Sequence, residues 1–340
     1  MSEKKPWFRR PSRVIPTAFL AAGVAFTITA LVTPWPAALA IRALFEKGAN
    51  DTVTEMLPYV PEGGLDETLD VAYAEGGVDT TLDVFSPSGS SEALPTVIWI
   101  HGGAWISGHK EDVRPYTRIL ASYGFTTVSL NYTVAPEATY PTALGQLNTA
   151  LEYLVDNAAE LRIDPQRIVI AGDSAGAQYT SQLATLVTNP EYAELVGITP
   201  ALTPEQLRAV ILNCGIYDVS GIPNAPGIGG WGFRTALWAY LGERDWTGTA
   251  GDKEMSTLNY VTADFPETWI SGGNDDPLTA TQSKPLAARL DELGVPVTSV
   301  FYADDHTPAL PHEYQFHLDF EAARTALDST VDFLGNVLRD

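Results

Sequence analysis

The chain has 340 residues, 45% of them hydrophobic, which is enough for one large α/β domain or two smaller ones. Its formal net charge of −22 would repel nucleic-acid phosphates, so the composition argues against nucleic acid as a partner. Cys214 is the single cysteine, which excludes an intramolecular disulfide and a cysteine-based zinc site.

The first 35 residues are predicted to form a basic N-terminus followed by a transmembrane or signal-anchor segment. Basic side chains crowd the first thirteen positions, and the nineteen residues from Val14 to Val32 carry no charge. Such a run is about long enough to cross a bilayer as a helix. The basic flank favours a cytoplasmic N-terminus, with the rest of the chain outside the cytoplasm. A cleaved signal peptide, which would secrete the protein, is the alternative, because Ala38-Leu39-Ala40 resembles a processing site.

Residues 36–65 are predicted to hold an amphipathic helix and a linker. From Pro36 to Leu57, apolar and charged side chains recur at helical spacing. This helix is expected either to lie on the membrane or to dock on the domain that follows it.

Residues 66–340 alternate between strand and helix patterns. Two strands with hairpin character come first, at Leu69–Ala74 and Thr80–Phe85. Further strands are predicted at Thr96–Ile100, Thr126–Leu130, Arg167–Ala171, Ala209–Cys214, Thr268–Ser271 and Val297–Tyr302. Helices are predicted at Arg114–Tyr123, Ala143–Leu161, Gln178–Leu186, Gln282–Leu293 and Phe320–Leu338. This alternation predicts a mostly parallel central sheet with helices on both faces.

The pattern Gly-x-Ser-x-Gly at Gly172–Gly176 directly follows the β-branched run Ile168–Ile170 and precedes a predicted helix. In this context the serine lies on a sharp turn that lifts its hydroxyl above the sheet edge. The two glycines leave room where strand and helix approach each other. We therefore interpret Ser174 as a nucleophile, with a tight structural turn as the alternative.

The segment His101-Gly102-Gly103-Ala104-Trp105 directly follows the predicted strand Thr96–Ile100. Small residues in such a loop can present backbone N–H groups to a reacting oxyanion. The predicted oxyanion hole consists of the N–H groups of Gly102, Gly103, Ala104 and Ala175. His101 is expected to brace the loop, with a catalytic base as the alternative, and Trp105 is a candidate for the wall of a substrate pocket.

Three stretches resemble the hormone-sensitive-lipase-like carboxylesterases of the α/β-hydrolase superfamily. They are HGGAW, the segment from Asn131 to Leu144, and RIDPQRIVIAGDSAGA, and the resemblance is dense from about residue 95 to 180. It implies an α/β-hydrolase fold and cofactor-independent hydrolysis of carboxylic esters through a Ser–Asp–His triad. Two departures are Ala104, where the family has a third glycine, and Ala177, where it has a glycine after GDSAG. Ala104 still supplies an N–H group, so the oxyanion hole is not in doubt.

The other two members of the triad should follow Ser174 in the order acid, then histidine. The family's acid precedes Pro-Leu, which selects Asp276, with Asp275 as the alternative. For the histidine we favour His312, because an aromatic-rich segment follows it. His306 is the alternative, since it has the usual distance from the last predicted strand.

Residues 221–265 lie between two predicted strands and are expected to form a cap or lid insertion. The glycine-rich run Gly227–Gly232 is predicted to be a mobile loop beside the pocket, and Trp231 is a second candidate for the pocket wall. No metal-ligand spacing or phosphate-binding loop is found, so neither a metal nor a cofactor is expected.

Together, the residues and the resemblance predict a serine esterase that acts on a small-molecule ester through an acyl-enzyme intermediate. A serine peptidase or amidase is one alternative, because the same triad cleaves amides. A non-catalytic surface binding protein with an α/β-hydrolase fold is the other.

Overall fold

The computed structural model describes residues 29, 32–75, 77–90, 92–224 and 227–339. The predicted membrane segment from Val14 to Val32 lies outside these residues, except for Thr29 and Val32. None of the helices in the described ranges combines the length and the apolar character that a membrane crossing requires.

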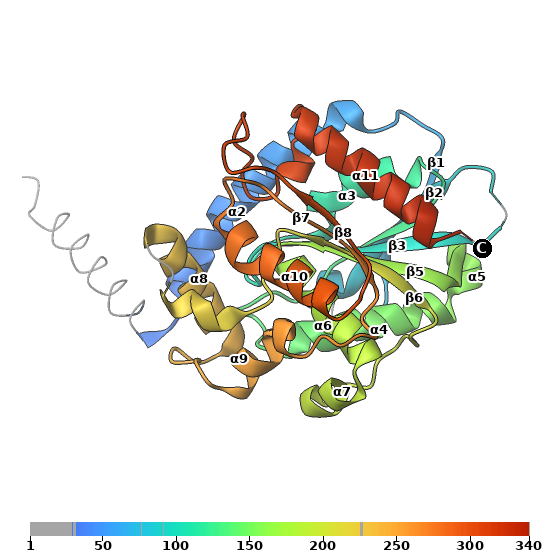
Figure 1. The fold of residues 1–340 in the computed structure, drawn as a ribbon. Coiled ribbons are helices and arrows are strands. Elements are labelled where there is room, and N and C mark those ends of the chain that lie inside the picture. The colour runs from blue at the N-terminus through green and yellow to red at the C-terminus, as the bar shows by residue number, and fades with distance from the viewer. Residues whose placement is uncertain (1–28, 30–31, 76, 91, 225–226, 340) are drawn as a thin grey trace, which may run out of the picture.

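Among the described residues, eight strands form one sheet in the order β1-β2-β4-β3-β5-β6-β7-β8 (Figure 1). Strand β2 pairs antiparallel with β1 and with β4, and every later pairing is parallel. The strands are β1 (Leu65–Ala72), β2 (Thr81–Pro87), β3 (Leu94–Ile100), β4 (Thr126–Leu130), β5 (Ile163–Asp173), β6 (Leu207–Asn213), β7 (Glu267–Gly272) and β8 (Val297–Phe301). The mostly parallel sheet predicted from the alternation is therefore confirmed.

Helices cover both faces of this sheet. The α-helices are α2 (Trp35–Met56), α3 (Lys110–Ala121), α4 (Thr142–Asp156), α5 (Ala158–Leu161), α6 (Ala175–Thr188), α7 (Pro190–Val196), α8 (Gly227–Leu241), α9 (Ala250–Met255), α10 (Lys284–Glu292) and α11 (Glu321–Val337). Shorter helical turns are η1 (Leu57–Tyr59), η2 (Gly77–Thr80), η3 (Val219–Asn224), η4 (Thr257–Asn259), η5 (Thr279–Ser283) and η6 (Tyr314–Phe316).

The central strands are buried on both sides, which is why they read as continuous apolar runs. Successive side chains of a strand point to opposite faces. In β3, Ile98 and Ile100 belong to the same buried cluster as residues of α4, α6 and α10, whereas Val97 and Trp99 belong to the cluster that includes residues of α3 and α11. Figure 1 shows α3 and α11 on one side of the sheet and α4, α6 and α10 on the other.

Edge strand β1 starts four residues before the predicted strand at Leu69. Most of its residues are exposed, so its apolar alternation is weak. A bulge between Thr68 and Val71 also shifts the register against β2, with Asp70 in the left-handed region. The hydrophobic pattern therefore could not locate its first residues.

Helix α2 occupies almost the whole range where the sequence predicts an amphipathic helix, and it docks on the α/β domain. The Arg42 guanidinium donates to the carboxylate of Glu137 at 2.8 Å and 2.5 Å. It also donates to the backbone oxygens of Ile106 at 2.6 Å and Ala135 at 2.8 Å. These bonds tie the helix to the loop that follows β3 and to the loop that follows β4.

The glycine-rich run Gly227–Gly232 is helical, as the first part of α8, so the prediction of a mobile loop there is wrong. The second half of α8 buries Ala236, Leu237 and Tyr240, and the helix packs against α2. This packing extends a helix through residues whose intrinsic propensity opposes it, because tertiary contacts override propensity. The segment lies between β6 and β7, where the insertion is expected.

Candidate active site

Ser174 lies at a strained turn between β5 and α6. Its backbone has φ 51° and ψ −118°, a conformation that L-residues rarely adopt. The turn leaves no room for side chains at its glycines. A Cβ at Gly176 would lie 2.0 Å from the carbonyl oxygen of Ile100, and one at Gly172 would lie 2.4 Å from the Gly176 backbone. The motif therefore holds the serine on a turn wedged against the neighbouring strand.

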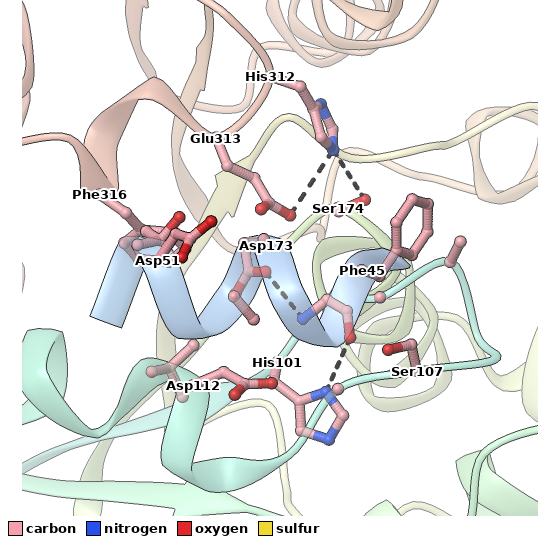
Figure 2. A pocket seen from close by; sticks show the side chains of 18 of the residues that line it. Phe45, Asp51, His101, Ser107, Asp112, Asp173, Ser174, His312, Glu313 and Phe316 are labelled. Atoms are coloured by element: carbon pink, nitrogen blue, oxygen red, sulfur yellow. Dashed lines mark hydrogen bonds and ion pairs between the residues drawn. The ribbon is translucent and has the colours of Figure 1, made fainter. Parts of the chain in front are cut away.

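His312 lies between Ser174 and Asp276. Its Nε2 is 3.0 Å from the Ser174 Oγ (Figure 2). Its Nδ1 is 2.8 Å from Oδ2 of Asp276. Asp276 follows β7 and is buried, and its second oxygen accepts the backbone N–H of Leu278 at 2.9 Å. These contacts hold the imidazole with one nitrogen toward the carboxylate and the other toward the serine.

The alternative residues lie elsewhere. The ring of His306 packs on Tyr302, with 4.6 Å between the ring centroids, and the side chain of Asp275 is exposed. Of the two predicted histidines and two predicted acids, the structure brings His312 and Asp276 to Ser174.

The charge environment favours the protonated form of His312. Burial lowers the pKa of this imidazole, but the hydrogen bond that its Nδ1–H donates to Asp276 and the negative charge of Glu313 outweigh burial and raise the pKa to about 9. A carboxylate beside each ring nitrogen thus makes the imidazole a strong base.

The loop after β3 has positive φ angles at Gly103, Ala104 and Trp105, namely 110°, 51° and 62°. These angles curl the loop so tightly that a Cβ at Gly103 would lie 2.2 Å from the Ser107 carbonyl oxygen. Within the described ranges, no protein acceptor is recorded for the N–H groups of Gly103, Ala104 and Ala175. These three groups are therefore available to a ligand.

The N–H group of Gly102, which was predicted to contribute to an oxyanion hole, is not free. It donates to Oδ2 of Asp173 at 2.8 Å, so it is already engaged. The other oxygen of Asp173 accepts Nε1–H of Trp99 at 2.7 Å. This aspartate thus fixes the start of the loop from the position next to Ser174.

His101 braces the same loop from below. Its Nδ1 donates to the Gly102 carbonyl oxygen at 2.8 Å, and its ring stacks on Tyr132 at 4.3 Å between centroids. Burial lowers the pKa of His101 to about 3, so the imidazole is neutral at ordinary pH.

A cavity of about 500 Å³ opens over these groups. Its lining includes Ser174, His312 and the His101–Ala104 loop, together with apolar side chains that come from α2, α8 and η6: Leu44, Phe45, Phe233 and Phe316. Helix α2 runs directly along the cavity (Figure 2).

Neither tryptophan that was predicted to form the pocket wall lines this cavity. Trp105 is fully buried, stacked on Tyr240 and bonded through Nε1 to Gln178. Trp231 lies on α8 with 46% of its surface exposed. The inward turn of the loop at Ala104 and Trp105 explains why the first of them enters the core.

The BD-FAE family model matches residues 82–290, which is more than half of the chain. The chain belongs to the BD-FAE family. This family is part of the α/β-hydrolase superfamily, so the membership of that superfamily predicted from the sequence motifs is confirmed.

Esterase LipQ of Mycobacterium tuberculosis is 26% identical over 285 residues, which cover 83% of this chain and 62% of LipQ. A relative from Acanthamoeba polyphaga mimivirus is 26% identical over 222 residues, which cover 63% of this chain and 60% of that protein. The chain thus spans about three fifths of the length of these two curated relatives.

Solved structures of esterases have a similar fold. Esterase B of Lactobacillus rhamnosis has a TM-score of 0.76 and 23% identity, over 88% of this chain and 95% of its own. EstE1, a carboxylesterase cloned from a metagenomic library, has a TM-score of 0.69 and 20% identity, over 89% and 98% of the two chains. At this identity the likeness establishes the α/β-hydrolase fold, so that part of the predicted fold is confirmed.

Two features of the pocket of this BD-FAE member escaped sequence reasoning. Helix α2 lies outside the resembling region, and no local pattern indicates that its Leu44 and Phe45 line the cavity. Glu313 adjoins His312 in the sequence, and that adjacency is the one signal that could have marked it. Its Oε1 lies 3.6 Å from Nε2 of His312.

Proposed function

We propose that this member of the BD-FAE family is a serine hydrolase that cleaves small-molecule carboxylic esters. The observation that carries the proposal is the hydrogen-bonded series from Asp276 through His312 to Ser174, with separations of 2.8 Å and 3.0 Å. This series borders a cavity into which the ester can enter. A serine becomes a competent nucleophile when a histidine accepts its proton and a carboxylate orients that histidine.

In the proposed reaction, Nε2 of His312 takes the proton of Ser174 as Oγ attacks the ester carbonyl carbon. The N–H groups of Gly103, Ala104 and Ala175 stabilise the oxyanion of the tetrahedral intermediate. The imidazolium then protonates the leaving alcohol, and the acyl group stays on Oγ. Water, deprotonated by the same imidazole, attacks the acyl-enzyme; the acyl–Oγ bond then breaks, the imidazolium returns the proton to Oγ of Ser174, and the acid is released. Asp276 stabilises the imidazolium in both halves of the reaction.

The relatives support an ester as the substrate. Esterase LipQ matches 83% of this chain. A structure of esterase B inhibited by a tributyrin phosphonate has the same fold, with a TM-score of 0.73. A phosphonate mimics the tetrahedral intermediate of ester hydrolysis, and the inhibitor in that structure is derived from an acylglycerol. A short acyl ester is therefore the substrate class to test first.

The test is hydrolysis of p-nitrophenyl butyrate together with labelling by a fluorophosphonate probe. The wild-type protein should do both. Ser174→Ala should do neither, because no other side chain in the proposed scheme can carry the acyl group. Ser220→Ala, which alters an exposed serine, is the matched control and should behave like the wild type. Hydrolysis of p-nitrophenyl butyrate by Ser174→Ala at the wild-type rate would refute the proposal.

We propose further that the N-terminal segment anchors the protein in a membrane, with the catalytic domain outside the cytoplasm. Support comes from the uncharged sequence run from Val14 to Val32. Large exposed apolar side chains also gather on the two mutually packed helices α2 and α8: Trp35, Leu39, Leu44, Phe45, Ile228 and Trp231.

The anchor is tested by carbonate extraction of membranes from cells that express the full chain. The protein should remain in the washed membranes with its N-terminus intact, and external protease should digest it. Release of a chain that begins after Ala40 would instead support a cleaved signal peptide and a secreted enzyme.

A further inference from the structure

The cavity over Ser174 is lined by acidic residues and, within the part of the chain that the structure describes, by no lysine or arginine. The acidic lining residues are Asp51, Glu55, Asp112, Asp173 and Glu313. Charges of one sign in a concave site raise the local concentration of oppositely charged ligands. The lining therefore points toward a cationic ligand, provided that one of these charges is uncompensated.

Two of the five acids have a basic side chain beside them, and burial opposes the ionisation of two more. Asp51 pairs with Lys47 at 2.6 Å, and Glu55 pairs with His317 at 2.6 Å. Burial raises the pKa of Asp112. Burial and the negative charge of Glu313 together raise the pKa of Asp173. Glu313 is the remaining acid. It faces the reacting groups, and among the described residues it has no cationic partner when His312 is neutral.

Glu313 lies between the catalytic imidazole and the oxyanion loop (Figure 2). Its Oε1 is 3.6 Å from Nε2 of His312, and it would lie 3.0 Å from a Cβ placed on Gly102. The side chain is 32% exposed and borders the cavity, so a ligand can reach it. The backbone of Glu313 has φ 58°, in the left-handed region that disfavours residues other than glycine. Such strained positions are common at functional sites, which is consistent with a functional role for the Glu313 side chain.

We infer that Glu313 is a specificity-determining residue that favours esters whose alcohol carries a cationic amine. The inference rests on the proposed ester hydrolysis. In that reaction Nε2 of His312 protonates the leaving alcohol, so the alcohol oxygen must approach the atom beside which the carboxylate lies. A positive charge a few bonds from that oxygen then lies close to Glu313. The carboxylate attracts this positive charge and repels an alcohol with a negative charge.

The experiment compares butyrylcholine with 3,3-dimethylbutyl butyrate, which has the same shape with carbon in place of the charged nitrogen. Rates are measured at about pH 9.5, above the pKa of His312, so that the imidazole does not neutralise Glu313. The wild type should prefer the choline ester in kcat/KM by about tenfold, the factor that follows from 1.4 kcal/mol of electrostatic attraction. Glu313→Gln should bring the ratio close to one.

Glu292→Gln is the matched control, because it removes the same charge from an exposed position on α10. Its ratio should equal that of the wild type. If Glu313→Gln does not fold, the wild-type ratio is measured in rising salt, which should lower it, because salt screens a charge that solvent can reach.

Equal rates on the two esters, or a preference that Glu313→Gln retains, would overturn the inference while leaving ester hydrolysis intact. If the wild type cleaves neither ester and the fluorophosphonate does not label Ser174, the proposed function itself is refuted.

Discussion

Removal of the negative charge at Glu313 should move the pH dependence of catalysis to lower pH. The imidazole must be neutral to accept the proton of Ser174, so kcat/KM rises with pH through the pKa of His312 in the free enzyme. Glu313 is among the groups that raise this pKa to about 9. Glu313→Gln keeps the shape of the side chain but removes the charge, so the imidazole should lose its proton at lower pH.

The size of this shift follows from the separation of 3.6 Å between Oε1 and Nε2. Two unit charges at this distance interact by about 1.2 kcal/mol in water and by about 4.6 kcal/mol at an effective dielectric constant of 20. The side chains of His312 and Glu313 are 35% and 32% exposed, so solvent screening favours the lower value. At 1.36 kcal/mol for each pH unit, the acidic limb should move by about one unit.

Two other carboxyl groups bear on this titration, and a buried thiol lies near them. Asp276 contacts Nδ1, Asp173 lies at the end of β5, and Cys214 follows β6, with Asp276 and Glu313 raising the pKa of the buried thiol. Glu313→Gln leaves these side chains in place, but it also removes a charge that raises the pKa of Asp173 and of Cys214, so the measured shift is the net effect of losing the Glu313 charge.

A neutral aliphatic ester followed in a pH-stat between about pH 6 and 10 gives the profile without the spontaneous hydrolysis of nitrophenyl esters. Glu292→Gln serves as the control for loss of one distant charge. An acidic limb that stays in place in Glu313→Gln would refute the electrostatic reasoning, whatever happens to the maximal rate.

Further substitutions probe other parts of the site. Asp276→Asn should lower kcat by about 10⁴, because it favours the wrong imidazole tautomer; stopped-flow hydrolysis with an unchanged kcat would exclude this role. Gly176→Ala should destabilise the protein by about 3 kcal/mol, because the new Cβ would lie 2.0 Å from a carbonyl oxygen. Gly145→Ala is the control. Gly145 lies in α4 with open space around it, so this change should be neutral or stabilising by up to about 1 kcal/mol. Thermal melts compare the two, and equal melting temperatures would contradict the steric account. Arg42→Ala should raise KM about tenfold, because α2 loses the hydrogen bonds that hold it against the cavity wall. Unchanged KM and unchanged protease sensitivity of α2 would show that other contacts hold the helix in place.

The order of strands and helices could be predicted because it rests on short-range patterns. Buried parallel strands are continuous apolar runs, and the turn at Ser174 needs glycines at fixed offsets. The errors fall where distant packing opposes local preference. Gly227–Gly232 is helical because the rest of α8 packs in the core and against α2. Trp105 is buried because Ala104 and Trp105 turn inward with positive φ angles.

The sequence by itself determined the fold family and the place of the serine turn, because both depend on residues that are neighbours in the chain. Only the tertiary structure decided which histidine lies against Ser174. His306 and His312 are six residues apart, and the course of the loop after β8 determines which of them reaches the end of β5. The same holds for α2 and Glu313, which contribute to the cavity through contacts between segments far apart in the sequence.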